Sequence, residues 1–455
     1  MSIVSEKRAN GPVAAFMRPI NSLVERYIPS ALVFVIVLTI VVAILALALT
    51  DVGPVDVIRS WGDGLAGLLA FMTQMALVLL LGHALANTSP VHRLLTKLGA
   101  IPRTPLQAYV FVFVVAALAC LITWGLGLVV GGLLAKEVAA QLRARGVKLH
   151  FPLLVAAGYS GFVVWHMGYS GSGPLTAATE GSFLAEQLGR TIPLSDTTFS
   201  PWNIAAAGAT IVVVALALAI VAPKRNAPIF ELEFDAREKQ VEEEKVVTPA
   251  DRLDASRILT LLVGLALVAY LAVHFVEGGT LTLDIVNWSF LALIFLLVRN
   301  PFELVRLVRN AAANVGDILL QFPLYAGILG MMVGSGLIGV FSDFFVNIST
   351  PQTFGLMALL SAGLVNFFVP SGGGQFAVQG PIMLDAANRL GVDPSVAIMA
   401  VSYGDQWTNM IQPFWALPLL AIAGLKMRDI LGYTTITFLA AGLVFAATLL
   451  IVGAG

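Results

Sequence analysis

Residues 344–384 read FFVNISTPQTFGLMALLSAGLVNFFVPSGGGQFAVQGPIML, with no charged side chain among them. One membrane-spanning helix needs about 20 apolar residues, so this stretch is too long for a single crossing. Its middle carries Pro-Ser-Gly-Gly-Gly-Gln at 370–375, and proline and glycine interrupt helices. The stretch therefore predicts two helices joined at a glycine-rich tip, as a re-entrant hairpin over 351–390.

A second stretch of the same kind covers residues 104–135. It opens with Thr-Pro, and the same dipeptide opens the other hairpin. Its tip, Thr-Trp-Gly-Leu-Gly at 123–127, lies as far from that dipeptide as Val-Pro-Ser-Gly-Gly does at 369–373. A basic segment follows the stretch, and a single crossing would place that segment outside the cytoplasm, against the positive-inside rule. A hairpin over 104–142 keeps both ends inside.

Other motifs repeat at similar spacing. Tyr159 and Tyr403 each precede a proline by the same number of residues. Gly-Asp occurs at 62–63 and at 316–317, where it is expected to open matching helices with the carboxylate complementing the helix dipole. Loop charges give each copy four crossings and one hairpin, in opposite orientations. Inverted repeats with interrupted helices are typical of secondary transporters that work by alternating access.

The composition makes the bilayer the solvent of this chain. Of 455 residues, 58% are hydrophobic and 12% are charged, against roughly 25% charged in soluble domains. The formal net charge is −1, and basic residues are spread among loops, so no nucleic-acid partner is expected. The sequence therefore predicts that the chain is surrounded by membrane lipid.

The predicted fold is an all-α polytopic membrane protein, an inverted repeat with about nine transmembrane helices and two re-entrant hairpins. We expect it in the inner membrane of a bacterium with its N-terminus in the cytoplasm. The segments are a cytoplasmic N-terminal segment 1–28, a first repeat 29–222, a cytoplasmic linker 223–257, an extra helix 258–283 and a second, inverted repeat 284–455.

The hairpin tips are candidate anion sites, because bare backbone N–H groups and helix N-termini attract carboxylates. At the second tip the candidate substrate-binding residues are Ser371, Gly372, Gly373, Gly374 and Gln375, with Asn366 nearby and Gln379 as a secondary candidate. At the first tip they are Thr123 and Gly125. In the alternative interpretation, the glycines only allow tight turns and close packing.

Asp405 interrupts an apolar crossing and is surrounded by polar residues. A carboxylate inside the membrane is a functional hypothesis by default. We expect it either to bind a sodium ion with Thr408 and Asn409 or to accept a proton. Asn409 is also a candidate for substrate binding. The alternative is a structural acid that caps a broken half-helix.

His166 lies in the matching helix of the first copy, ahead of the break Gly-Ser-Gly-Pro at 171–174. Histidine titrates near physiological pH, so His166 is a candidate to carry the coupling proton or to pair with a substrate carboxylate. Ser170 and Ser172 are candidate substrate-binding residues beside it. The alternative for His166 is a buried hydrogen-bonding side chain with no role in transport.

Two motifs carry a family resemblance, Asn-Phe-Phe-Val-Pro-Ser-Gly-Gly-Gly-Gln-Phe-Ala-Val-Gln-Gly-Pro at 366–381 and Tyr-Gly-Asp-Gln-Trp-Thr-Asn-Met-Ile-Gln-Pro at 403–413. They resemble the bacterial short-chain fatty acid transporter family. That family is similar to a broader group with the sodium/dicarboxylate symporters, whose tips carry Ser-Asn-Thr, which this chain lacks. The resemblance implies ion-driven uptake of butyrate-like acids or acetoacetate.

The predicted membrane core contains no lysine or arginine, which favours a monocarboxylate over a dicarboxylate. Another small organic anion, such as a dicarboxylate or an aminobenzoyl conjugate, is the alternative substrate class, and a passive channel is a third interpretation. No metalloprotease or serine-hydrolase motif favours an enzyme. No cofactor is expected beyond a coupling sodium ion or proton, and a homodimer is compatible with the sequence.

Overall fold

The computed structural model describes residues 31–223, 246–312, 315–366, 369, 371–412 and 414–453. Every regular element in these ranges is a helix, as the sequence predicts. The predicted N-terminal segment 1–28, most of the linker and Pro370 at the second tip lie outside the described residues.

The first half of the chain contains eleven described helices between residues 31 and 220. They are α2 (Ala31–Leu49), α3 (Pro54–Gly64), α4 (Leu69–Ala86), α5 (Ser89–Gly99), α6 (Pro105–Ile122), α7 (Trp124–Ala144), α8 (Phe151–Ser160), the 3₁₀ helix η1 (Gly161–Met167), α9 (Ser172–Ala178), α10 (Phe183–Leu188) and α11 (Pro201–Ile220). After the linker come α12 (Pro249–Asp254) and α13 (Arg257–Val276), the predicted extra helix.

The second half repeats the order of the first. Its helices are α14 (Leu283–Leu297), α15 (Pro301–Ala312), α16 (Gly316–Ser335), α17 (Leu337–Ile348), α18 (Pro351–Asn366), α19 (Gly372–Leu390), α20 (Pro394–Thr408), the 3₁₀ helix η2 (Asn409–Ile411), α21 (Ala416–Ala423) and α22 (Met427–Gly453). In this order α14 corresponds to α2, the pair α18–α19 to α6–α7, and α20–η2–α21 to α8–η1–α9.

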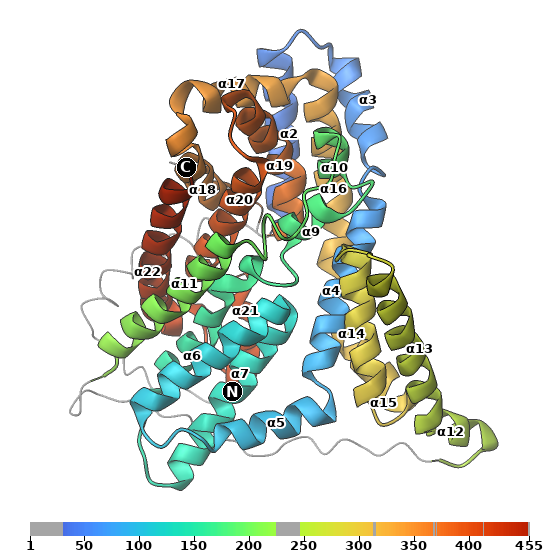
Figure 1. Ribbon diagram of the computed structural model, residues 1–455, viewed down its shortest axis with the longest axis vertical. Coiled ribbons are helices and arrows are strands. Elements are labelled where there is room, and N and C mark those ends of the chain that lie inside the picture. Colours follow the sequence, from blue (N-terminus) through green and yellow to red (C-terminus); the bar gives the residue numbers. More distant parts are fainter. Residues whose placement is uncertain are drawn as a thin grey trace.

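In each half, the first two helices pack on the third helix of the other half. Helices α2 and α3 pack on α16, while their counterparts α14 and α15 pack on α4. In Figure 1 the first of these groups lies at the top of the molecule and the second at the lower right. Helix α7 contacts α21, and α19 contacts α9, so each hairpin packs against the broken helix of the other half.

Eight of the described helices are long and apolar enough to cross a membrane, and three shorter apolar helices, Val35–Leu49, Leu283–Leu297 and Leu337–Ile348, accompany them. Both helices of the first predicted hairpin, α6 and α7, are among the eight. Length and composition therefore do not separate a re-entrant hairpin from two full crossings.

The repeated Thr-Pro dipeptide marks a helix start in both halves. The Thr104 hydroxyl caps α6 by accepting a hydrogen bond from the Gln107 N–H at 3.3 Å, and proline occupies the first turn, where no N–H is needed. The Thr350 hydroxyl accepts from the Thr353 N–H at 3.3 Å before α18. The boundaries of both hairpins are thus local properties of the sequence.

Helix α16 ends at Gly336, whose φ of 74° lies in the left-handed region. One prediction about a helix start is wrong. Asp63 does not lie at the start of a helix, whereas Gly316 begins α16. It lies exposed in the last turn of α3, where a carboxylate does not complement the helix dipole.

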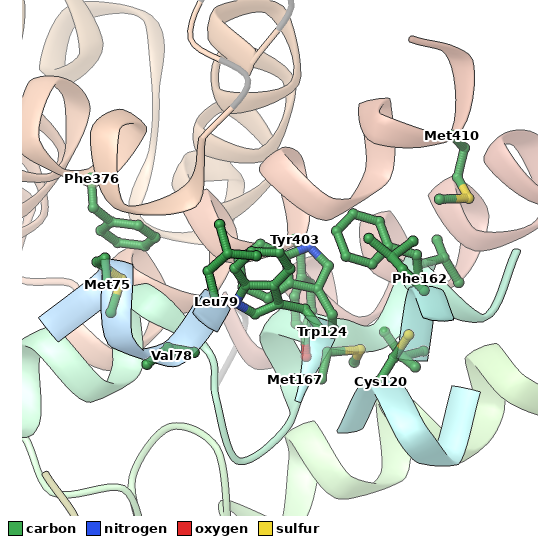
Figure 2. Packing of buried hydrophobic residues seen from close by; sticks show 14 of the residues in the cluster. Met75, Val78, Leu79, Cys120, Trp124, Phe162, Met167, Phe376, Tyr403 and Met410 are labelled. Atoms are coloured by element: carbon green, nitrogen blue, oxygen red, sulfur yellow. The ribbon is translucent and has the colours of Figure 1, made fainter. Parts of the chain in front are cut away.

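Aromatic and sulfur-containing side chains from both halves fill the centre of the molecule. Figure 2 shows Trp124 at the start of α7 among Met167, Phe162 and Tyr403, with Phe376 of α19 nearby. All five are buried. This packing surrounds the points at which the two long broken helices change from α-helix to 3₁₀ helix.

Candidate functional site

The interruptions of the two broken helices meet in the middle of the fold. In the first, α8 passes into η1 and then into an extended turn at Gly168 before α9. In the second, α20 passes into η2, which contacts η1. Because 3₁₀ turns and breaks leave backbone groups without intrahelical partners, side chains from elsewhere must satisfy them.

The site centres on His166 of η1 and Asp405 of α20. The His166 Nε2 atom lies 3.8 Å from the Asp405 Oδ1 atom, and both side chains are 0% exposed. The Asn409 amide donates to Asp405 Oδ1 at 3.2 Å. Asp405 Oδ2 and both ring nitrogens of His166 have no hydrogen-bond partner among the described residues. The structure thus joins the two titratable residues that sequence reasoning selected separately.

An amide network holds the carboxylate side of this pair. The Asn366 side-chain nitrogen lies within 2.8 Å of both the Asp405 carbonyl and Asn409 Oδ1 and 2.9 Å from the Thr408 hydroxyl. The Gln412 amide donates to Asn409 Oδ1 at 2.7 Å. Asn366 Oδ1 has no partner in the described part of the chain. Asn366, which the sequence assigns to the second tip, therefore lies beside Asp405 together with Thr408 and Asn409.

Two residues of this site are absent from the sequence-based set. Gln406 accepts a hydrogen bond from the His166 backbone N–H at 2.9 Å, and its own amide nitrogen is left unpartnered among the described residues. Tyr159 donates to the Asn409 carbonyl at 2.7 Å. The repeat of Tyr159 and Tyr403 was the signal that could have identified the tyrosine.

The start of α19 packs directly on the His166 imidazole. A methyl group on Gly372 would stand 2.5 Å from His166 Nε2 and 2.7 Å from the Trp165 ring, so only glycine fits there. Gly373 and Gly374 face the rings of Phe71, Phe322 and Tyr325 in the same way. The glycine-rich tip therefore brings a helix N-terminus against the imidazole through close contact of bare backbone.

The polar side chains of this second tip make hydrogen bonds within the hairpin. The Ser371 hydroxyl accepts from the Gly374 N–H at 3.4 Å as the N-cap of α19. The Gln375 amide donates to the Ala362 carbonyl at 2.9 Å and to Gln379 at 3.0 Å, which ties α19 to α18. Gln375 Oε1 has no described partner.

The first tip reaches the site only through its aromatic residue. Thr123 and Gly125 lie against Gly82 of α4. Trp124 contacts the Trp165 ring with centroids 6.1 Å apart, and its backbone N–H donates to the Ser170 hydroxyl at 3.3 Å.

Ser170 is thus engaged with the first tip, and Ser172 begins α9, where its carbonyl accepts from the Thr176 hydroxyl at 2.6 Å. The structure brings these residues to the edge of the site rather than beside Asp405.

The charge content of the interior restricts what the site can bind. The charged or titratable side chains His150, His166, Glu303 and Asp405 are buried, and no lysine or arginine in the described ranges is. The described residues also contain no group of three His, Cys, Asp or Glu side chains that could hold a metal ion. An anion that enters this site would therefore meet His166 as the buried side chain that can take up a proton and become positively charged.

Unpartnered polar atoms of both kinds occur around the pair. The donors without described partners are Trp165 Nε1, Gln406 Nε2 and the Tyr325 hydroxyl, and the acceptors are Asp405 Oδ2, Asn366 Oδ1 and Gln375 Oε1. Leaving a buried polar atom unpaired costs about 1–3 kcal/mol, so such atoms are normally bonded to water or ligand. The site is equipped for an anion and for a cation.

An all-helical membrane chain with two broken helices meeting around a buried His–Asp pair has the features of a multi-pass membrane transporter. The sequence model of the short-chain fatty acid transporters matches residues 13–452. The chain belongs to that family.

Relatives of similar length support the assignment. A protein of Escherichia coli K12 named "putative short-chain fatty acid transporter" is 42% identical over 439 residues, covering 96% of this chain and 98% of its own. One of Haemophilus influenzae with the same name is 37% identical over 460 residues, covering 97% and 99%. The crystal structure of the Alcanivorax borkumensis YdaH transporter shares the fold, with a TM-score of 0.57 at 16% identity over 92% of this chain and 98% of that one.

Proposed function

We propose that this protein takes up short-chain monocarboxylates, such as butyrate or acetoacetate, by ion-coupled symport across the inner membrane. The observation that carries the proposal is the buried His166–Asp405 pair against the glycine start of α19. The family supplies the substrate class. The unpartnered polar atoms around the pair support a carboxylate and a coupling ion at this position.

The substrate carboxylate binds at the N–H groups that begin α19, beside the His166 ring, when these two groups, which are in direct contact in this structure, move apart. The N–H groups at the start of a helix carry partial positive charge and bind anions. Gly372 leaves this backbone bare, and His166 Nε2, which has no described partner, points at it. An imidazole that donates or carries a proton completes the anion site. The Gln406 amide is a further donor beside it.

The coupling ion binds on the Asp405 side of the pair. Asp405 Oδ2 and Asn366 Oδ1 are acceptors without described partners, and Thr408 and Asn409 lie beside them. A sodium ion suits such oxygens. A proton on Asp405 suits the burial of this carboxyl group and the absence of a described partner for its Oδ2 atom. The proposal therefore places either ion at the same carboxylate and leaves its identity to experiment.

Charge balance sets the expected stoichiometry. Removing a net charge from water costs several kcal/mol even after relaxation. A monoanion entering a site in which both fixed groups are 0% exposed adds one negative charge. One monovalent cation entering with it restores the balance. We therefore expect one cation per carboxylate and an electroneutral cycle.

An inverted repeat supports alternating access in this proposal. The repeated order of elements, the exchange of α2–α3 and α14–α15, and their location at opposite ends in Figure 1 fit two copies of opposite orientation. In such folds the two copies rock around a central site. The site lies where broken helices from both copies meet, as this mechanism requires.

Uptake of labelled acetoacetate into proteoliposomes tests the proposal, because acetoacetate avoids the leak of protonated butyrate through the bilayer. Accumulation under an imposed sodium gradient or an imposed proton gradient supports symport and identifies the ion. Accumulation under neither gradient contradicts symport and leaves a uniporter or a channel. If a dicarboxylate or an aminobenzoyl conjugate inhibits the uptake of labelled acetoacetate more strongly than butyrate does, the substrate is that compound class and not a short-chain monocarboxylate.

A further inference from the structure

A cavity of about 230 Å³ lies away from the His166–Asp405 pair, enclosed by α2, α16, α17 and the α18–α19 hairpin. We name it the lateral cavity. Its walls are aliphatic, aromatic and methionine side chains, with two polar exceptions, Ser361 and Gln379. Its lining combines fully buried side chains, such as Met332 at 0% exposed, with Val41 of α2 at 42% exposed. Since α2 is apolar throughout, the mouth beside Val41 faces the hydrocarbon of the membrane.

The α18–α19 hairpin separates this cavity from the pair. Val365 lines the cavity, while the next residue, Asn366, bonds to the Asp405 network. On α19, Gln379 lines the cavity, whereas Phe376 stacks on the His166 ring with centroids 6.1 Å apart. The lateral cavity is therefore a second compartment behind the hairpin.

The polar residues of the cavity form one short chain of hydrogen bonds. The Gln379 amide donates to the Ser361 hydroxyl at 3.0 Å, and Gln379 Oε1 accepts from the Gln375 amide at 3.0 Å. The Ser361 hydroxyl hydrogen and the second amide hydrogen of Gln379 keep no acceptor among the described residues. A ligand with an apolar body and one polar end that accepts hydrogen bonds matches this arrangement.

The volume limits the length of such a ligand. At about 30 Å³ for each water-sized group, the cavity holds on the order of eight non-hydrogen atoms. This is the size of a carboxylic acid of four to six carbons. A phospholipid chain spans roughly half of a ~30 Å hydrocarbon core and would leave most of its length outside.

We propose that the lateral cavity is a second binding site for short-chain carboxylic acids in their protonated form, entered from the membrane, with the carboxyl group on Ser361 and Gln379. The protonated form is the one that partitions into hydrocarbon, because a carboxylate there costs several kcal/mol. The site does not require the proposed symport, since its ligand is reached from lipid.

Photolabelling of the full chain in lipid nanodiscs tests the site. The probe is 4,4-azipentanoic acid, a short acid with a photoreactive diazirine, and adducts are located by peptide mass spectrometry. We expect adducts on α2 and on α18–α19 that an excess of hexanoic acid prevents. Adducts that hexanoic acid does not reduce, or equal labelling of these helices by a phospholipid with a photoreactive chain, would overturn the proposal in favour of ordinary lipid contact.

Three variants complete the test. Val41→Trp closes the mouth, and its matched control is Val263→Trp on α13, which is 44% exposed and outside the cavity. We expect cavity labelling to fall about tenfold in Val41→Trp and not in the control. Gln379→Leu keeps the volume of the side chain and removes the polar end of the cavity. We expect cavity labelling to fall about tenfold, which corresponds to ~1.4 kcal/mol of lost hydrogen bonding.

Asp405→Asn should keep cavity labelling even if it abolishes uptake, which separates this proposal from the proposed symport. Full labelling of both Val41→Trp and Gln379→Leu would contradict the site. Thermal unfolding of each variant in detergent shows that a lost adduct does not come from a misfolded protein.

Discussion

Replacing Asp405 with asparagine removes one charge from the buried pair while keeping its shape. A monovalent cation bound about 4 Å from an ionised Asp405 would be attracted by about 4 kcal/mol at an effective dielectric constant of about 20. Since ~1.4 kcal/mol is a factor of ten, loading of the site with its coupling ion should weaken on the order of 10³-fold. We expect Asp405→Asn to lose gradient-driven accumulation of labelled acetoacetate in proteoliposomes.

Folding should survive the same change. The asparagine oxygen can still accept the bond that the Asn409 amide makes to Asp405 Oδ1 at 3.2 Å, and the unpartnered Oδ2 is replaced by a neutral amide nitrogen. Burying a carboxylate whose second oxygen has no described partner is costly, and the asparagine amide carries no charge to bury. The melting temperature in detergent should therefore match that of the wild type.

Asp393→Asn is the matched control. Asp393 caps the start of α20, the same helix, and is exposed, and asparagine caps helices equally well. Its uptake should equal that of the wild type. If Asp405→Asn accumulates acetoacetate against its gradient as the wild type does, the pair has no part in coupling and the reasoning fails.

Three further variants or conditions test the site from other sides. Gly372→Ala places a methyl group 2.5 Å from His166 Nε2 and should cost about 1–3 kcal/mol, with at least a tenfold loss of uptake, whereas Gly208→Ala, with open space around it, should not change uptake. A potassium diffusion potential set with valinomycin should drive no accumulation by itself, because the cycle is electroneutral, and potential-driven uptake would contradict one cation per carboxylate. Tyr403→Phe should lower the free energy of unfolding by about 1–3 kcal/mol, and Tyr159→Phe, which loses a bond inside the site, should reduce uptake as well.

The helices with clear charge and glycine patterns could be predicted from the sequence. The helix pairs α6–α7 and α18–α19 begin and end close to the bounds predicted for the two hairpins, because Thr-Pro starts, glycine tips and charge-free runs act locally. That these pairs are re-entrant stays a prediction. The amphipathic helices α3, α5 and α15 were not predicted. They are short and carry charges, so they were indistinguishable from loops when only long apolar runs were sought.

Candidate site residues could be selected from the sequence, but their contacts could not. Asp405 and Asn409 were selected because polar residues in an apolar crossing are costly, and Asn366 because it precedes the glycine-rich tip. The bond between His166 and Gln406 joins residues 240 positions apart. No local sequence pattern indicates a contact between residues so far apart. The packing of the two halves determines which polar residues meet.

The two broken segments depend on each other, since each receives its missing hydrogen bonds from the opposite half of the chain. Tyr159 of the first half donates to the Asn409 carbonyl of η2 at 2.7 Å. Tyr403 of the second half donates to Asn203 Oδ1 at 2.8 Å, and the Asn203 amide in turn donates to the carbonyl of Met167 at the end of η1 at 3.1 Å.

Each tyrosine bond contributes on the order of 1 kcal/mol, so each half stabilises the broken segment of the other. Any motion that separates the halves must therefore break or replace both tyrosine links, and it must do so at the point where His166 and Asp405 meet. A site that binds or releases its ligand there is coupled to that motion through the same backbone carbonyls.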